Sequence, residues 1–332
     1  MSPVSPVSPV PGAGGLGVVV VNYGDPSVLE HHLLRHDLTA VARVVVVDNF
    51  STAAHRDAVA ALCRRRGLDA VLLPRNDGFG AGVNAGAAHA LAAGCRALLL
   101  VNPDLRLEPA VAAALHAEVR AHPDRLVAPR IVREDGRRWF DGAQVSLRTG
   151  RTGRTGRLTG PDLVPWLTGA CLAVHRDLWE AVGGFAPEYF LYWEDVDLSL
   201  RVQRRGGRLL VREDLLAVHA VGGTQAGAGK SPAYVRFHCR NRLLFARRNL
   251  GARAAARQAL GAPRYAAEVL RRDGWRRLLV DRAPLRAAVR GTLAGWVVAF
   301  SPRRPPVPGA ARAAADAGAA PVRARAGAGH RG

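Results

Sequence analysis

The first part of the chain alternates short apolar runs with longer amphipathic segments, and this order restricts the fold more than any other feature. Apolar runs rich in branched residues occupy residues 16–21, 43–47, 70–73 and 97–101. Continuous apolar runs of this length are typical of parallel strands that are covered on both faces. Helix-like segments occupy residues 27–38, 53–66, 82–93 and 108–122. The alternation predicts an open α/β fold with a mostly parallel central sheet, which binds ligands at the carboxyl ends of its strands.

The pattern loosens between residues 125 and 163. An Arg-Thr-Gly repeat at 148–156 predicts a mobile loop in this region. Regular structure is expected again at 166–174, followed by helices near 176–182 and 194–205.

The predicted organisation has four parts. An α/β domain at 16–250 is followed by a basic amphipathic helical extension at 251–300, and Pro/Gly-rich compositions predict disordered tails at 1–15 and 301–332. The four cysteines are far apart and fit no metal or redox spacing, which favours ordinary buried thiols in a reducing cytosol: Cys63, Cys95, Cys171 and Cys239.

The positive charge is concentrated at the C-terminal end. The chain has a formal net charge of +20, and residues 240–332 contain 20 arginines against four acidic residues. Such a region suits anionic membrane lipid, a diphosphate-bearing acceptor or nucleic acid, and arginine bias from base composition is the alternative. Nucleic acid is not expected, because interleaved aromatic residues for base stacking are missing. The longest late apolar run, 292–300, is too short to span a bilayer, so we expect a cytoplasmic protein at the inner face of the membrane.

Polar residues follow each of the predicted strands. Amides, hydroxyls and carboxylates after four successive strands indicate a crevice for a polar ligand: Asn22 and Tyr23, then Asp48, Asn49 and Ser51, then residues 76–84, then Asn102 and Asp104. Asp48 suits a nucleoside ring N–H or a ribose hydroxyl, and its alternative role is to cap the next helix. The glycine-rich stretch at 76–84 allows close approach of backbone to a ligand and opens a helix whose N–H groups favour anionic oxygens.

Asp104 is the first candidate for a metal ligand. Mg²⁺ and Mn²⁺ prefer carboxylate oxygens beside substrate phosphates, whereas the alternative for Asp104 is again a helix cap. A second acidic group lies at Glu194, Asp195 and Asp197, bounded by aromatic and aliphatic residues. Three carboxylates in such surroundings are costly unless they are solvated, paired or used, and helix capping is the plainer interpretation of two of them.

Six motifs occur in order along the chain: Val-Asn-Tyr at 21, Asp-Asn-x-Ser at 48, Asn-x-Gly-Phe-x-x-Gly-x-Asn at 76, Asn-Pro-Asp at 102, Thr-Gly-Ala at 168, and Gly-Gly-Phe at 183 with Phe-x-Tyr-x-Glu-Asp-x-Asp-Leu at 190. Together they resemble the family 2 glycosyltransferases of the GT-A fold, especially their rhamnosyltransferase-like bacterial members. The resemblance covers residues 17–249. Any one motif is weak, whereas the ordered combination is specific.

The resemblance implies a role for each motif. The nucleotide-sugar would be bound by Asn22, Tyr23, Asp48, Ser51, Asn76, Gly82, Asn84 and Asn102. Asp104 matches the metal position of the family's Asp-x-Asp motif, which is degenerate here because Asn102 replaces the first aspartate. His219 matches a histidine that helps hold the Mg²⁺ or Mn²⁺ in some relatives, and its alternative is a neutral structural histidine after a strand.

The resemblance also implies the catalytic group and its surroundings. Asp195 matches the catalytic base, with Glu194 and Asp197 as supporting carboxylates. The acceptor would lie near Thr168, Gly169, Trp193 and Asp197. Arg240 and Asn241 match a recurrent Arg-Asn pair whose role the sequence does not reveal.

The implied reaction is transfer of a sugar, with inversion, from a nucleotide-diphosphate donor to a hydroxyl of a glycan or polyprenyl-diphosphate-linked acceptor, as in cell-envelope synthesis. By resemblance, dTDP-rhamnose is the first expected donor and UDP-sugars are the second. A sugar-phosphate nucleotidyltransferase would need a basic glycine-rich loop after the first strand, and the residues at 22–25 are Asn-Tyr-Gly-Asp instead. A non-catalytic basic protein that binds membrane or nucleic acid would not need the ordered acidic and amide motifs.

Overall fold

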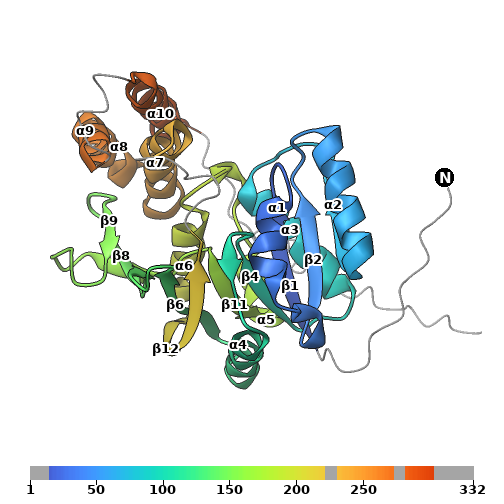
Figure 1. Cartoon of the computed structure of the whole chain (residues 1–332). Coiled ribbons are helices and arrows are strands. Elements are labelled where there is room, and N and C mark those ends of the chain that lie inside the picture. Colours follow the sequence, from blue (N-terminus) through green and yellow to red (C-terminus); the bar gives the residue numbers. More distant parts are fainter. Residues whose placement is uncertain (1–14, 221–229, 273–280, 303–332) are drawn as a thin grey trace, which may run out of the picture.

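The central feature of the fold is one twisted sheet with strand order β3-β2-β1-β4-β11-β6-β12-β5 (Figure 1). The computed structural model describes residues 15–220, 230–272 and 281–302. The four predicted strands are confirmed as a parallel group: β1 (Leu16–Asn22), β2 (Arg43–Asp48), β3 (Asp69–Leu72) and β4 (Ala97–Val101). Nearly every side chain of β1, β2 and β4 is buried, because helices cover both faces of this half of the sheet.

The remaining strands of the large sheet follow β4 in the chain. They are β5 (Leu105–Arg106), β6 (Arg125–Arg133), β7 (Arg138–Phe140), β11 (Cys171–His175) and β12 (Arg208–His219). β11 runs antiparallel to both β4 and β6, whereas β12 is parallel to β6. The expectation of a mostly parallel sheet is therefore confirmed, with β11 antiparallel at its centre and the short strands β5 and β7 antiparallel to β12 and β6.

Helices of the first half lie close to their predicted positions. They are α1 (Ser27–His31), α2 (Ala53–Arg66), α3 (Phe79–Ala92) and α4 (Pro109–Ala121). The helix expected over 27–38 is wrong beyond His31, where two short 3₁₀ turns follow, Leu33–Arg35 and Leu38–Ala40. Asp37 causes part of this break, because its carboxylate caps the second turn by accepting from Thr39 N at 2.9 Å.

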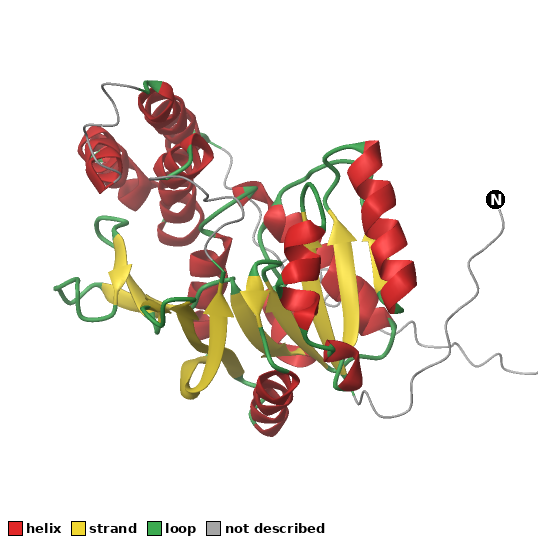
Figure 2. Ribbon diagram, in the orientation of Figure 1, coloured by secondary structure: helices red, strands yellow, loops and turns green. Residues whose placement is uncertain are grey.

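A small second sheet replaces the loop expected at 148–156. It consists of β8 (Ala143–Ser146), β9 (Thr152–Arg154) and β10 (Leu163–Trp166), all antiparallel (Figure 2). The Asp162 carboxylate orders the turn between β8 and β9, since it accepts from Ser146 Oγ at 2.5 Å and from Arg148 N at 2.9 Å. The expectation of a mobile loop is therefore wrong for β9.

The C-terminal half adds helices α5 (Arg176–Val182), α6 (Glu194–Arg204), α7 (Pro232–Phe245), α8 (Ala252–Leu260), α9 (Ala262–Arg272) and α10 (Ala283–Phe300), with a 3₁₀ turn at Pro187–Tyr189 and a π-helical turn at Ala246–Leu250. α7 packs along α10, and helices α7 to α10 form the group at one side of the large sheet in Figure 1. Helices α8, α9 and α10 lie within the predicted extension 251–300, and α10 packs along α7, which belongs to the predicted preceding domain.

Pro284 lies in the first turn of α10, where proline is tolerated, and therefore starts this helix rather than kinking it. No helix within the described ranges is long and apolar enough to cross a bilayer. The four cysteines are free and buried, as expected. The predicted tails lie outside the described residues, apart from residues 15, 301 and 302.

Candidate active site

The carboxyl ends of β1 and β2 bring Asn22 and Asp48 side by side. The two residues pair in register across the strands, and Asn49 N donates to Asn22 O at 2.9 Å. Both side chains are buried, and Asn22 Nδ2 donates to Gly24 O at 2.9 Å. Tyr23 lies beyond the strand end and is 60% exposed.

Asp48 does not cap the following helix, because Thr52 occupies that position and accepts from His55 N. Its Oδ2 lies 3.4 Å from Arg56 Nε, while its Oδ1 is buried and has no hydrogen-bond partner within the described part of the chain. Burial raises the pKa of Asp48, against the lowering effect of Arg56. A buried acceptor of this kind suits a ligand N–H or O–H. Nearby, Ser51 Oγ lies 2.9 Å from His55 Nδ1.

The Asn76 loop is tied to this strand end by Asn49, a residue of the predicted polar crevice to which the sequence assigned no role of its own. Asn49 Nδ2 donates to Asn76 Oδ1 at 3.0 Å and to Gly78 O at 3.2 Å, and Gly78 N donates to Asn76 Oδ1 at 2.9 Å. Phe79 N, at the start of α3, donates to Phe190 O at 2.7 Å. This N–H is therefore used inside the protein, and the anion site expected at the start of this helix has one donor fewer.

Gly82 and Asn84 hold α3 in place. A Cβ on Gly82 would lie 3.0 Å from Val21 Cγ1, so the absence of a side chain lets α3 approach β1. Asn84 Nδ2 donates to Phe185 O at 2.8 Å, and Asn84 Oδ1 accepts from Phe185 N at 2.9 Å. The observed contacts of these two predicted nucleotide-binding residues are thus with the protein itself.

Asp104 and His219 are far apart in the sequence but meet because β5 and β12 pair. His219 stands opposite Leu105 in this antiparallel pair, and Ala220 N donates to Asp104 O at 2.9 Å. His219 Nε2 lies 3.6 Å from Asp104 Oδ2, and the imidazole stacks on Trp139 with ring centroids 4.5 Å apart. Asp104 is not a helix cap, because Glu108 precedes α4.

The polar atoms of this pair are incompletely satisfied. Asp104 Oδ1 and His219 Nδ1 are buried and make no hydrogen bond with any described residue. Burial raises the pKa of Asp104 and lowers that of His219, which favours the neutral imidazole that binds metals. No group of three or more His, Cys, Asp and Glu side chains arranged around a metal occurs in the described ranges. Asp104 and His219 would suit Mg²⁺ or Mn²⁺ only if substrate phosphate or water supplied the remaining ligands.

Asp195 lies at the start of α6, with its carboxylate held by two backbone N–H groups. Gly169 N donates to Oδ2 at 3.0 Å and Val196 N donates to Oδ1 at 2.8 Å. Burial raises the pKa of Asp195 to about 6, despite these two hydrogen bonds. The carboxylate is therefore mostly ionised at neutral pH and is a stronger base than an ordinary aspartate.

The Thr-Gly-Ala motif connects this carboxylate to the end of β4. Thr168 Oγ1 accepts from Ala170 N at 3.3 Å, and Ala170 O accepts from Asn102 N at 2.9 Å. Gly169, between them, donates to Asp195 as described. The structure thus joins the metal candidate and the carboxylate candidate through one short segment.

The other two acidic residues behave differently. Glu194 is buried, and burial together with the charge of Asp195 raises its pKa well above the ordinary value, which favours the uncharged carboxyl. Asp197 is fully buried and accepts from Tyr189 Oη at 3.0 Å, Arg201 Nε at 2.7 Å and Asn249 Nδ2 at 2.7 Å. Asp197 therefore joins α6 to its neighbours and supports the site from behind.

Comparison with known proteins decides the family. Residues 18–183 match the family described as Glycosyl transferase family 2. The chain belongs to this family. A segment of 43 residues is 51% identical to an N-acetylglucosaminyl-diphospho-decaprenol L-rhamnosyltransferase of Mycobacterium tuberculosis, covering 13% of this chain and 14% of that protein's length. The low-salt glycan biosynthesis hexosyltransferase Agl10 of Haloferax volcanii is 23% identical over 203 residues, 57% of this chain and 62% of that protein.

Solved structures confirm the GT-A fold of this family 2 glycosyltransferase. GalNAc-T7 with UDP, GalNAc and Mn²⁺ superposes with a TM-score of 0.51 at 18% identity, covering 70% of this chain and 48% of that one. S. aureus TarS 1-349 in complex with UDP-GlcNAc superposes with a TM-score of 0.50 at 18% identity, covering 86% and 82%. At these identities the likeness concerns the fold alone.

The segment before the base of this glycosyltransferase is strained. Phe190, Tyr192 and Trp193 have φ values of 62°, 64° and 77°, a region that residues other than glycine rarely adopt. Asn241 holds the segment, because its fully buried Nδ2 lies 2.8–2.9 Å from the carbonyl oxygens of Tyr189, Leu191 and Tyr192.

The arginine of the Arg-Asn pair supports the same segment. Arg240 Nη1 donates to Asn241 Oδ1 at 2.6 Å and to Glu188 O at 3.0 Å. Trp193 is buried, and its Nε1–H lies 3.3 Å from His238 Nδ1 on α7, so this predicted acceptor residue packs inward. The sequence contained the Arg-Asn pair, but the pair's role appears only once α7 is placed against the strained segment.

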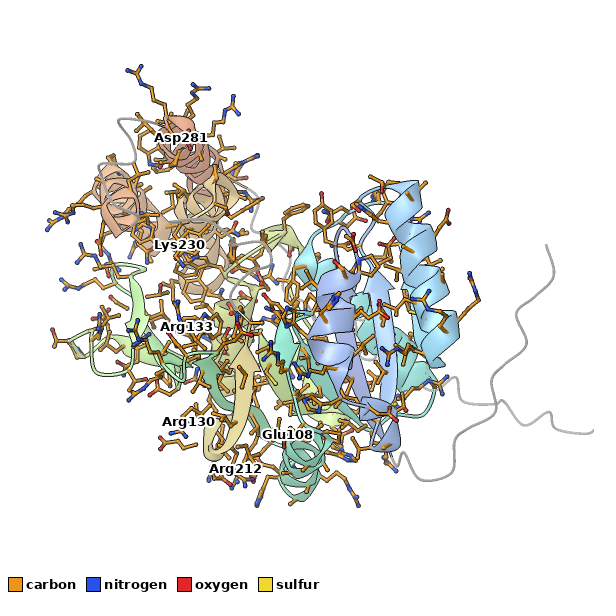
Figure 3. The ribbon with its side chains drawn as sticks, in the orientation of Figure 1. Glu108, Arg130, Arg133, Arg212, Lys230 and Asp281 are labelled. Atoms are coloured by element: carbon orange, nitrogen blue, oxygen red, sulfur yellow. The ribbon has the colours of Figure 1, made fainter. Side chains whose placement is uncertain are left out.

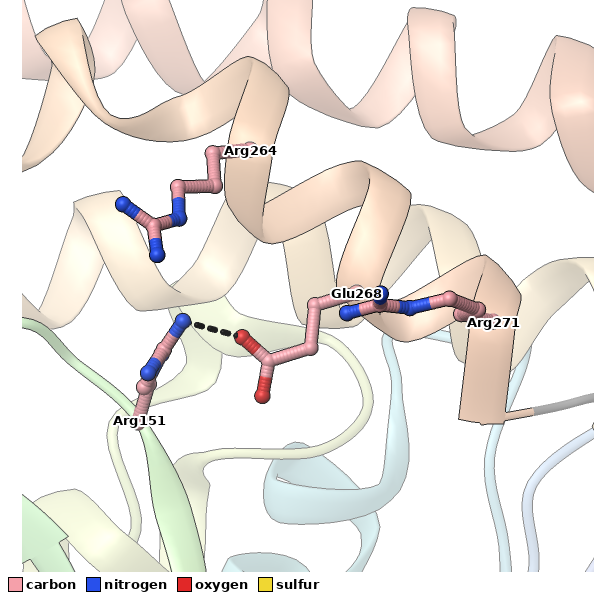
Figure 4. Close-up of a pocket in the computed structure, with 4 residues that line it drawn as sticks. All are labelled: Arg151, Arg264, Glu268 and Arg271. Atoms are coloured by element: carbon pink, nitrogen blue, oxygen red, sulfur yellow. Dashed lines mark ion pairs between the residues drawn. The ribbon is translucent and has the colours of Figure 1, made fainter.

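A separate hollow of about 410 Å³ lies between β9 and α9, lined by Arg151, Arg264, Glu268 and Arg271 (Figure 4). Arg151 Nη2 and Glu268 Oε2 form an ion pair at 2.7 Å across it. None of the predicted site residues lines this hollow.

Proposed function

We propose that this family 2 glycosyltransferase transfers a sugar, with inversion at its anomeric carbon, from a nucleotide-diphosphate donor to an acceptor hydroxyl. One observation carries the proposal: the Asp195 carboxylate is held by two N–H groups, and burial raises its pKa to about 6. A general base works best when its pKa lies near the operating pH.

In the proposed reaction, Asp195 takes the proton of the acceptor hydroxyl as that oxygen bonds to the anomeric carbon. The bond from this carbon to the donor's diphosphate oxygen breaks on the opposite face, and the nucleoside diphosphate leaves with its electron pair. No protein nucleophile takes part, so the anomeric configuration inverts. The raised pKa of Glu194 favours its uncharged form, which limits the negative charge beside the base.

The donor is proposed to lie along the strand ends. Asp48 Oδ1, a buried acceptor without a hydrogen-bond partner among the described residues, would bind the nucleoside. Asn22, Tyr23, Ser51, Asn76 and Asn102 are the other proposed donor contacts at this edge of the sheet. Asp104 and His219 are the residues that would hold Mg²⁺ or Mn²⁺. Such a cation neutralises charge that develops on the leaving diphosphate.

The proposed acceptor is a polyprenyl-diphosphate-linked sugar, and the proposed donor is dTDP-rhamnose, with UDP-sugars second. The support is the short segment shared with the mycobacterial rhamnosyltransferase, whose name specifies a decaprenol-diphosphate acceptor. The chain matches only 14% of that protein's length, so the substrates are proposed by likeness. This acceptor places the enzyme at the cytoplasmic face of a membrane, in cell-envelope glycan synthesis.

A donor panel tests the proposal. The protein is incubated with dTDP-rhamnose, UDP-N-acetylglucosamine, UDP-glucose or GDP-mannose, with Mn²⁺ or Mg²⁺, and with a short-chain prenyl-diphosphate-linked N-acetylglucosamine. Release of nucleoside diphosphate identifies the donor, and NMR of the product gives the anomeric configuration. Retention of configuration would contradict the base mechanism, and turnover of another donor alone would replace the proposed sugar.

A further inference from the structure

The exposed large apolar side chains of the C-terminal helices are concentrated on α10. Five of them recur at intervals of three or four residues and so share one face: Leu285 (44% exposed), Val289 (52%), Leu293 (52%), Val297 (73%) and Phe300 (62%). Single exposed apolar residues are ordinary on a protein surface, but a continuous stripe marks an interaction site.

The opposite face of α10 explains why this stripe points outward. A Cβ on Gly291 would lie 2.2 Å from Arg236 O, and a Cβ on Gly295 would lie 2.9 Å from Leu243 Cδ1, so α10 packs closely on α7 through its glycines. Trp296 also faces inward, where its Nε1 donates to Ala259 O at 2.9 Å. Within the described ranges the outer face remains uncovered, and side chains project freely from α10 near the labelled Asp281 in Figure 3.

The same outer face carries only positive charge. Arg282, immediately before α10, and Arg286 and Arg290 within it are exposed, and α10 contains no acidic residue. A second copy of this chain would bring no carboxylate from its own α10 to pair with these arginines. Anionic lipid supplies both phosphates for the guanidinium groups and an apolar layer for the stripe.

We propose that the outer face of α10 docks on an anionic membrane surface, with the helix lying in the plane of the headgroups. The arginines of its first half would contact lipid phosphates, and the apolar second half, from Leu293 to Phe300, would enter the acyl boundary. Trp296 does not belong to this docking face, because it packs on α8. Residues 275–279 of the predicted basic helical extension lie outside the described residues.

Vesicle binding by the full chain tests this surface independently of sugar transfer. The probe is co-sedimentation with vesicles of phosphatidylcholine alone or with phosphatidylglycerol, at low and high salt. Each basic residue near an anionic surface strengthens partition about fivefold at low salt, so R282Q/R286Q/R290Q is expected to weaken binding about 100-fold. The apolar variant L293Q/V297Q is expected to lose binding at both salt concentrations, and these exposed positions leave the packing with α7 intact.

The matched control removes the same charge elsewhere. Arg64, Arg65 and Arg66 are exposed at the end of α2, on the other side of the molecule (Figure 1), and R64Q/R65Q/R66Q is expected to retain vesicle binding within about threefold. Equal losses in the α2 and α10 triple variants would show attraction to net charge and overturn the proposal. Failure of the wild-type chain to bind anionic vesicles at low salt would also overturn it. Because no donor is present, either result is separate from the proposed transferase function.

Discussion

Replacement of the proposed base by its amide, Asp195→Asn, is expected to abolish sugar transfer while leaving donor binding intact. The amide keeps the shape of the side chain and can still accept from Gly169 N or Val196 N, but it takes no proton. Loss of a general base costs on the order of 10²- to 10⁴-fold in rate. Calorimetric titration with the donor separates binding from chemistry, because the affinity should remain within about threefold of wild type.

The raised pKa of Asp195 also fixes the pH dependence of the wild-type enzyme. With a pKa of about 6, the carboxylate is about 90% ionised at pH 7 and about 10% ionised at pH 5, so kcat should fall roughly tenfold between them. A carboxylate with the ordinary pKa of 3.8 would stay ionised over this range and would give almost no decline.

The raised pKa of Asp195 should also make the free energy of unfolding decrease as pH rises. The folded-state pKa lies above the unfolded one, so this carboxyl stabilises the fold at low pH, and the contribution disappears as pH rises through about 6. Between pH 5 and pH 8 the loss is about 1.4 kcal/mol for this group alone. Urea unfolding at both pH values measures it, and Asp195→Asn should remove that part of the pH dependence.

Two results would refute the assignment of Asp195. One is transfer by Asp195→Asn within tenfold of wild type. The other is a kcat that stays flat from pH 7 to pH 5. Glu194→Gln is the matched control, because the raised pKa of Glu194 favours its uncharged form and the amide should therefore preserve most of the activity.

Three further changes test the supports of the site. Asp104→Ala should weaken donor binding in the presence of Mn²⁺ at least tenfold, with little change without Mn²⁺, because a cation ligand is lost. Calorimetry with and without Mn²⁺ measures the two affinities. An undiminished metal-dependent affinity would show that Asp104 is not a metal ligand. Asn241→Leu should lower kcat while the KM for donor changes little, because three carbonyls of the strained segment lose their donor; steady-state kinetics test it, and unchanged kcat would contradict it. Gly78→Ala should destabilise the protein by several kcal/mol, since Gly78 has φ +98° and an added Cβ would lie 2.4 Å from Phe190 O. The control is Gly94→Ala, because Gly94 also has a positive φ but has open space around it. Thermal unfolding should show a lower unfolding temperature for Gly78→Ala than for Gly94→Ala.

The first half of the fold could be predicted from the sequence because its pattern is local. The four apolar runs between Leu16 and Val101 are all strands, as their pattern predicts. Two elements, β4 and α2, have the bounds that were predicted for them. The break after His31 was missed because the leucines of that segment are buried whether it forms one helix or several turns. Apolar periodicity reports burial, and it does not report where hydrogen bonds stop.

The second half was harder because its strands pair over long distances. β6 pairs with β11 and β12, which come 40 or more residues later in the chain, and β9 is held by a short antiparallel sheet rather than by its own composition. The Arg-Thr-Gly repeat has the composition of a loop, yet Thr152–Arg154 pairs with β8. Tertiary pairing overrides local preference most easily in such short strands.

The residues of the candidate site also fall into those that a local pattern places and those that only long-range contacts place. Residues that follow a strand, such as Asn22 and Asp48, could be placed because the carboxyl ends of parallel strands share one edge. Asn49 was noticed beside Asp48, but its hydrogen bonds to the Asn76 loop depend on a separation of 27 residues that no spacing rule gives. Asn84 was assigned to the ligand because it belongs to the same motif, whereas both its polar atoms bond to Phe185, 101 residues away.

The Arg-Asn pair shows what the placement of α7 adds to the chemistry. Asp195 is the second residue of α6, and the residues just before this helix have positive φ values that cost of order 1–3 kcal/mol each, so the segment needs external support to keep that conformation. Asn241 supplies this support at three carbonyls, and Arg240 orients Asn241 through its Oδ1. Since α7 also packs along α10, the helix proposed to lie on lipid and the segment that carries the base are fixed to one element. A docked α10 would therefore hold the base at a set height above the membrane, which is what an acceptor anchored by a lipid chain requires.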